Sequence, residues 1–130
     1  MRNTDTAQQD AAVEIQPGWR PGAPPVATLF LEGDLSREQL HEVAETLFRL
    51  VHRGHRQVVV DLGEVGHLDY RGLQPLVQRA PLLRAAGGDI KLCGASPYVA
   101  AILRVAGAWQ ELECYPNRAS ALAAFRPGWA

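Results

Sequence analysis

Apolar side chains recur at steps of three and four residues in several stretches of the sequence, as on one face of an α-helix. The clearest stretch follows Ser36, which has Gln39 three positions later and so carries the capping-box pattern of a helix start. Gly54 closes this predicted helix. Its apolar stripe consists of Leu40, Val43, Ala44, Leu47, Phe48 and Val51.

Three further helices are predicted in the second half of the chain. An apolar stripe runs from Leu73 to about Ala86, although Pro81 should kink this helix or remove one of its backbone hydrogen bonds. Ser96 and Pro97 supply a helix cap and a first-turn proline, and Gly107 ends that helix. The last predicted helix starts at Asn117 and carries Ala121, Leu122, Ala124 and Phe125.

Short β-branched runs between these helices predict strands. The predicted strands are 13–16, 26–31 (ended by Gly33 and Asp34), 57–62, 89–93 and 112–115. Residues 17–25, which include Trp19, are too rich in proline and glycine for anything but a loop, and 63–67 is also assigned as a loop.

The alternation of strands and helices predicts an α/β fold. We expect a mostly parallel central sheet of four to five strands with an antiparallel edge strand and four helices, in the order β-β-α-β-α-β-α-β-α. Residues 12–126 form the predicted domain, and 1–11 and 127–130 are predicted to be tails.

Composition narrows the classes of partner and compartment. Thirteen basic residues against fourteen acidic ones give no basic excess for nucleic-acid binding. No run approaches the roughly 18 apolar residues of a membrane span, and the polar start lacks a signal peptide, so we expect the cytosol. Cys93 and Cys114 have no metal-ligand spacing and are interpreted as reduced, buried thiols.

Residues able to carry chemistry are few. Asp34 and Asp61 end strands and could hold a divalent ion, but carboxylates there more often serve turns and caps. His67 and Asp69 could form a proton-transfer pair, and His52 and His55 could share a metal from one helical turn. A solvent-exposed, structural role is favoured for each of these. The sequence contains no glycine-rich phosphate loop and no nucleophile elbow, so no catalytic residue, cofactor or metal is predicted.

One junction stands out. Residues 58–73 read as strand, loop and helix, and they place Asp69, Tyr70 and Arg71 near a helix start. Exposed tyrosine and arginine side chains often lie at the energetic centre of protein interfaces. Burial of Tyr70 in the core and a freely solvated Arg71 form the alternative.

From about residue 13 to residue 125 the sequence resembles a STAS domain, the fold of bacterial anti-sigma factor antagonists. Four segments carry the resemblance, namely Leu31-Glu32-Gly33-Asp34-Leu35, the strand 58–62, Leu68-Asp69-Tyr70-Arg71-Gly72-Leu73, and Gly94-Ala95-Ser96-Pro97 with the helix after it.

The resemblance implies a partner kinase that is also an anti-sigma factor and that phosphorylates the second serine of an Asp-Ser-Ser-Gly-Leu motif. In this sequence Arg71 occupies that position and Tyr70 the preceding one, while Asp69 and Gly72 are retained. An arginine cannot accept a regulatory phosphate from a serine kinase. We therefore expect partner binding that serine phosphorylation does not switch. The expected contact residues are Ser36, His67, Asp69, Tyr70, Arg71, Gly72 and Ser96.

Three functions remain open. The favoured one is a protein-interaction module that binds an anti-sigma factor or another regulatory protein. The second is a STAS subunit that attaches to the ATPase of a bacterial lipid-transport ABC complex. The third is a small enzyme or ligand-binding domain that uses Asp34, Asp61, His67 or Tyr70. Two points also stay open: whether two copies associate through the first strand, and whether Trp19 covers the sheet edge or joins Trp109 in a second contact surface.

Overall fold

The computed structural model describes residues 12–126 and contains one five-stranded sheet with the strand order β1-β2-β3-β4-β5. The strands are β1 (Ala12–Gln16), β2 (Val26–Leu35), β3 (Gln57–Leu68), β4 (Asp89–Cys93) and β5 (Glu113–Tyr115). The edge strand β1 is antiparallel to β2, and all other pairs are parallel. The predicted α/β fold with an antiparallel edge is confirmed. The predicted tails, 1–11 and 127–130, lie outside the described residues.

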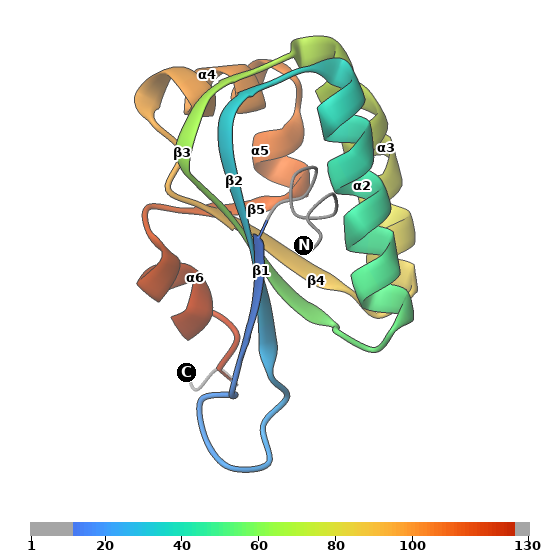
Figure 1. Ribbon diagram of the computed structural model, residues 1–130, viewed down its shortest axis with the longest axis vertical. Coiled ribbons are helices and arrows are strands. Elements are labelled where there is room, and N and C mark those ends of the chain that lie inside the picture. The colour runs from blue at the N-terminus through green and yellow to red at the C-terminus, as the bar shows by residue number, and fades with distance from the viewer. Residues whose placement is uncertain (1–11, 127–130) are drawn as a thin grey trace, which may run out of the picture.

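Helices cover the sheet on both faces (Figure 1). They are α2 (Arg37–His52), α3 (Tyr70–Ala85), α4 (Pro97–Val105), α5 (Ala108–Glu111) and α6 (Arg118–Ala123). The larger core lies between the sheet and α2 and α3 and extends to α4 and α5. A smaller core under α6 consists of Val26, Val59, Cys93 and Ala121. None of the helices within 12–126 has the length and apolar character needed to cross a bilayer.

Strands β2 and β3 extend further than predicted. The segment 63–67, assigned from sequence as a loop, belongs to β3, and β2 continues past Gly33 and Asp34 to Leu35. The register runs on to the pair Leu35–Leu68, with shifts between Phe30 and Glu32 and between Gly33 and Asp34. The loop prediction was wrong because glycines and charged residues there suggested a turn, whereas Val65 and Leu68 are buried in the core.

The chain between α4 and β5 also differs from expectation. Gly107 ends α4 with a positive φ of 82°, as glycine permits, and the one-turn helix α5 follows immediately. This helix was not predicted, and it shortens the last strand to Glu113–Tyr115. In contrast, α3 runs without a break through Pro75 and Pro81.

The two tryptophans discussed above do not form a joint surface. Trp19 is 46% exposed on the β1–β2 loop, where the Arg20 guanidinium lies 4.9 Å from its ring centre. Figure 1 places this loop at the bottom of the molecule and α5, which carries Trp109, in the upper half. Trp109 is partly buried against the main core and contacts the Arg104 guanidinium.

Helices α2 and α3 are in close contact at Gly72. A Cβ atom at this position would lie 2.8 Å from Leu40 Cδ1 and 3.0 Å from the backbone Cα of Arg37. The absence of a side chain at Gly72 therefore sets the spacing of the two helices near their first turns.

We expect Gly72→Ala to lower the free energy of unfolding by about 1–2 kcal/mol. The reason is that overpacking against a backbone atom typically costs about 1–3 kcal/mol, while the better helix propensity of alanine returns up to about 1 kcal/mol. Urea denaturation measures the change, with Gln78→Ala, an exposed position of the same helix, as the control. A Gly72→Ala protein as stable as the wild type would contradict the tight contact.

Candidate functional site

The ends of β2 and β3 and the starts of α2, α3 and α4 meet at one end of the molecule, at the top of Figure 1. The Asp69 backbone N–H donates to the Leu35 carbonyl at 3.0 Å, which ties the start of α3 to the residue preceding the α2 cap. Asp34 and His67 are neighbours in the β2–β3 register. We call the exposed side chains at this end, His67, Tyr70, Arg71 and Tyr98, the rim surface.

Asp69 is the polar group that orients Arg71 in the rim surface. Its side chain caps α3, because Oδ1 accepts the Arg71 backbone N–H at 2.9 Å. The same carboxylate accepts two bonds from the Arg71 guanidinium, Nε to Oδ1 at 3.2 Å and Nη2 to Oδ2 at 2.9 Å. These bonds from Arg71 lower the pKa of Asp69 to about 2, and the carboxylate in turn raises the pKa of Arg71. The guanidinium is thus held in one orientation.

Tyr70 and Arg71 both face solvent. The Arg71 side chain is 69% exposed even though it is paired with Asp69. Tyr70 is 44% exposed, and its hydroxyl accepts a hydrogen bond from the Gln74 side-chain amide at 3.2 Å. The alternative considered from the sequence, in which Tyr70 is buried in the core and Arg71 is freely solvated, is therefore wrong.

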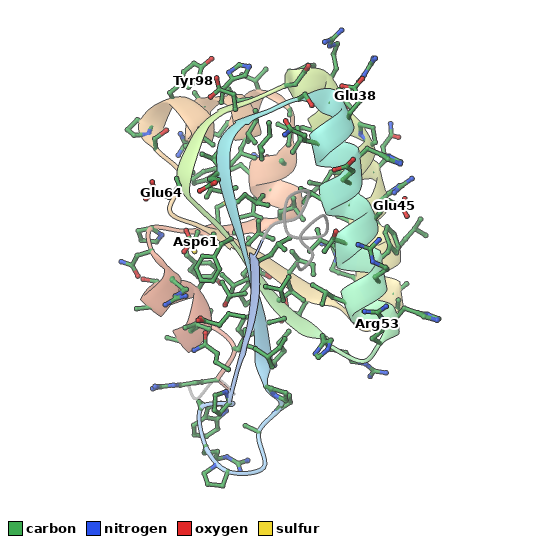
Figure 2. The ribbon with its side chains drawn as sticks, viewed as in Figure 1. Glu38, Glu45, Arg53, Asp61, Glu64 and Tyr98 are labelled. Atoms are coloured by element: carbon green, nitrogen blue, oxygen red, sulfur yellow. The ribbon has the colours of Figure 1, made fainter. Side chains whose placement is uncertain are left out.

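His67 pairs with a residue that the sequence reasoning missed. Its Nδ1 lies 2.8 Å from the Tyr98 hydroxyl, and the two rings stack with centres 5.7 Å apart. Tyr98 is 56% exposed in the first turn of α4, and Figure 2 shows it at the top of the molecule. The signal available in the sequence was its place directly after the Ser96-Pro97 cap. Because His67 bonds Tyr98 and Asp69 bonds Arg71, the His67–Asp69 proton-transfer pair is not formed.

Of the remaining predicted contact residues, Ser36 and Ser96 cap helices and Gly72 is buried. The Ser36 hydroxyl accepts the Gln39 N–H at 3.1 Å, and the Gln39 side chain accepts the Ser36 N–H at 2.9 Å. The Ser96 hydroxyl accepts the Val99 N–H at 3.1 Å and caps α4. Gly72 is buried beneath Leu40 and offers no side chain. Ser36 and Ser96 lie next to the rim surface, and Gly72 lies under it.

The other residues considered from the sequence form no reactive cluster. Asp61 Oδ1 accepts the Gly63 N–H at 2.9 Å, as a turn carboxylate does. Across residues 12–126, no group of three or more histidine, cysteine and acidic side chains is placed to hold a metal ion. Cys93 is buried and Cys114 is partly buried, and burial raises the pKa of each thiol to about 11. What the described residues assemble is a set of oriented polar and aromatic groups suited to binding.

Comparisons with known proteins agree with this fold. Residues 21–112 match the family model described as "Mlab, STAS domain". The chain is 28% identical over 96 residues to BtrV of Bordetella bronchiseptica, named as a candidate anti-sigma factor antagonist, and the match covers 74% of this chain and 83% of BtrV.

Two solved structures illustrate the range of proteins with this fold. A candidate anti-sigma factor antagonist from Thermotoga maritima superposes with a TM-score of 0.73 at 18% identity, covering 90% of this chain and 95% of the other. The STAS domain of a SulP transporter from Vibrio cholerae superposes with a TM-score of 0.60 at 25% identity, covering 76% and 79%.

The Asp69–Arg71 pair predicts an unusual titration. The folded pKa of Asp69 is about 2, below its ordinary value of 3.8, so the cap stabilises the fold above about pH 4 and is lost as the pH falls through about 2. Carboxyl carbon NMR should show Asp69 ionised down to about pH 2, and Arg71→Ala should move its midpoint upward. A midpoint that Arg71→Ala leaves in place would show that the guanidinium does not hold the carboxylate in solution.

Proposed function

Because this chain belongs to the STAS domain family, we propose that it is a non-enzymatic regulatory module that binds an anti-sigma factor-type protein through the rim surface. The likeness in sequence to a candidate anti-sigma factor antagonist supports this class of partner. The observation that carries the proposal is the Arg71 guanidinium, which is exposed and yet fixed by Asp69 next to an exposed tyrosine.

A fixed guanidinium is a good anchor for a protein partner. Ordering a free arginine on binding costs conformational entropy, whereas the two bonds from Asp69 already restrict this side chain. Its remaining N–H groups can donate to a carboxylate or to carbonyl groups of the partner. The Tyr70 ring beside it adds apolar area with few rotatable bonds.

We further propose that phosphorylation does not switch this contact. Arg71 has no hydroxyl, and it stands where the resemblance to the family places the acceptor serine. The two serines next to the rim surface, Ser36 and Ser96, use their hydroxyls to cap helices. A positive charge is therefore permanent at the position where a phosphate would add about two negative charges.

A second candidate function is a STAS subunit attached to the ATPase of a bacterial lipid-transport ABC complex. The same Arg71 supports it, because regulation by serine phosphate is not required there. The superposition on the STAS domain of a transporter shows that this fold also occurs in transport proteins. Binding to a transporter ATPase, with none to an anti-sigma factor, would favour this candidate.

We expect Arg71→Glu to weaken binding to a kinase-type anti-sigma factor by about 2 kcal/mol or more, which is roughly 30-fold in Kd. The reversed charge repels Asp69 and removes the oriented donors. Isothermal titration with purified anti-sigma factors from the same genome measures the change. Arg53→Glu is the matched control. Arg53 follows the last residue of α2, at the end of that helix away from the rim surface (Figure 2). Equal loss in both variants, or in neither, would remove Arg71 from the interface.

Incubation with a serine kinase of the anti-sigma class should leave residues 69–72 unmodified. The physical reason is the absence of a hydroxyl at position 71. Phosphopeptide mapping by mass spectrometry tests this, with Arg71→Ser as the variant expected to become modified. A phosphopeptide covering 69–72 in the wild-type protein would overturn the proposal that serine phosphorylation does not switch binding.

A further inference from the structure

A groove of about 510 Å³ lies between α2 and α3, beginning at the first turns of the two helices. It therefore adjoins the rim surface, because Gly72, which lines it, follows Arg71 in the chain. Its lining residues are Arg37, Glu38, Leu40, His41, Glu42, Ala44, Gly72, Pro75 and Leu76.

The floor of the groove is apolar and its far end is closed. Leu40, Ala44 and Leu76 are buried side chains of the main core. Directly after Ala44 on α2 and one turn after Leu76 on α3, the Arg79 guanidinium donates to Glu45 Oε2 at 3.0 Å and bridges α3 to α2. Figure 2 shows Glu38 near the start of α2 and Glu45 further along it. The open stretch thus spans about two helical turns.

The α2 wall of the groove carries acidic charge that the described residues leave largely unpaired. Glu38 and Glu42 are four residues apart on one helix face, an arrangement of like charges that destabilises a helix. Glu38 pairs at 3.7 Å with Arg37, which also lines the groove, and 75% of the Glu38 side chain is exposed. After the larger effect of Asp69, the Glu38 carboxylate also raises the pKa of Arg71. Glu42 makes no ion pair within residues 12–126, whereas Glu45 next along the helix is paired.

The α3 residues that line the groove carry no charge. Gly72, Pro75 and Leu76 line that side, and His41 on α2 lies 3.9 Å from Glu45. The groove therefore combines an apolar floor with a wall that carries Arg37 as well as two carboxylates, of which Glu42 has no ion pair within residues 12–126. A partner that fits this groove would insert an apolar side chain and place a cation beside it. The cation would relieve the repulsion between Glu38 and Glu42.

We propose that the groove receives a short helical segment of the protein partner, which inserts a leucine, isoleucine or phenylalanine and places an arginine or lysine one helical turn away against Glu38 and Glu42. One turn of a partner helix advances about 5.4 Å, close to the rise of about 6 Å between the two glutamates. This inference rests on the proposed function, since it assigns the partner chemistry next to the rim surface.

Two pairs of matched variants test the groove. Pro75→Lys puts a long cation over the floor and Pro81→Lys makes the same change at an exposed position of α3 outside the groove. Both substitutions restore a backbone N–H that proline lacks, so neither should weaken the helix. Glu42→Gln removes a groove carboxylate, and Glu64→Gln removes an exposed carboxylate from β3 (Figure 2).

The probe is a displayed library of helical peptides, selected on the wild-type protein and measured individually by fluorescence anisotropy. We expect enrichment of peptides with a large apolar residue and an arginine or lysine three or four positions away. Pro75→Lys should weaken them about tenfold or more and Glu42→Gln several-fold at low salt, while Pro81→Lys and Glu64→Gln bind like the wild type. No such enrichment, or equal binding to Pro75→Lys, overturns the proposal.

A second measurement separates this inference from the proposed function. An anti-sigma factor that loses affinity for Arg71→Glu but binds Pro75→Lys like the wild type would overturn the groove and leave the rim interface standing. Peptides that require the groove, together with no binding of any anti-sigma factor to the wild type, would support the groove and overturn the proposed partner class.

Discussion

The Asp69 carboxylate binds both the backbone at the start of α3 and the exposed guanidinium of Arg71. One oxygen satisfies an N–H at the start of α3, and both oxygens hold the Arg71 guanidinium. The helix start and the direction of the cation are therefore set by a single acidic side chain. Because that carboxylate is ionised down to about pH 2, the arrangement is constant over the range in which proteins function.

The position of Asp69 depends in turn on the unusual length of β2 and β3. The two strands remain paired to Leu35 and Leu68, and the Asp69 N–H then bonds the Leu35 carbonyl. The β-sheet thus continues directly into the rim surface without a free loop between them. Groups that a loop would leave mobile are carried by strand ends and first helical turns, so binding through them loses less conformational entropy.

The sequence predicted those features whose causes are local. The Ser36–Gln39 capping box, the Ser96-Pro97 helix start and the strand 89–93 were all predicted and are present, because each follows from a few neighbouring residues. The extension of β3 through 63–67 was not predictable in this way. Its glycines and charges favour a turn, and only pairing with β2 and burial of Val65 make it a strand.

The candidate site also contains features with local causes and features that depend on tertiary packing. Exposure of Tyr70 and Arg71 was one of two options in the sequence, and the choice depends on how α3 starts. The stacking of Tyr98 on His67 joins residues 31 positions apart, so the place of Tyr98 after the Ser96-Pro97 cap does not by itself predict the contact. The groove between α2 and α3 depends on the close approach at Gly72, which is a property of two packed helices.

Charge distribution sets the partner chemistry that the rim surface and the groove favour together. A phosphate at position 71 would stand beside the Asp69 carboxylate, so repulsion would oppose any acidic partner and disturb the helix start. Arginine at that position has the opposite effect, since it neutralises Asp69 locally. Along the α2 wall of the groove, the Glu42 carboxylate has no ion pair within residues 12–126. A partner segment that offers an acceptor to Arg71 and a cation to Glu42 would satisfy both, and this pairing of opposite charges fixes the direction in which the segment can lie.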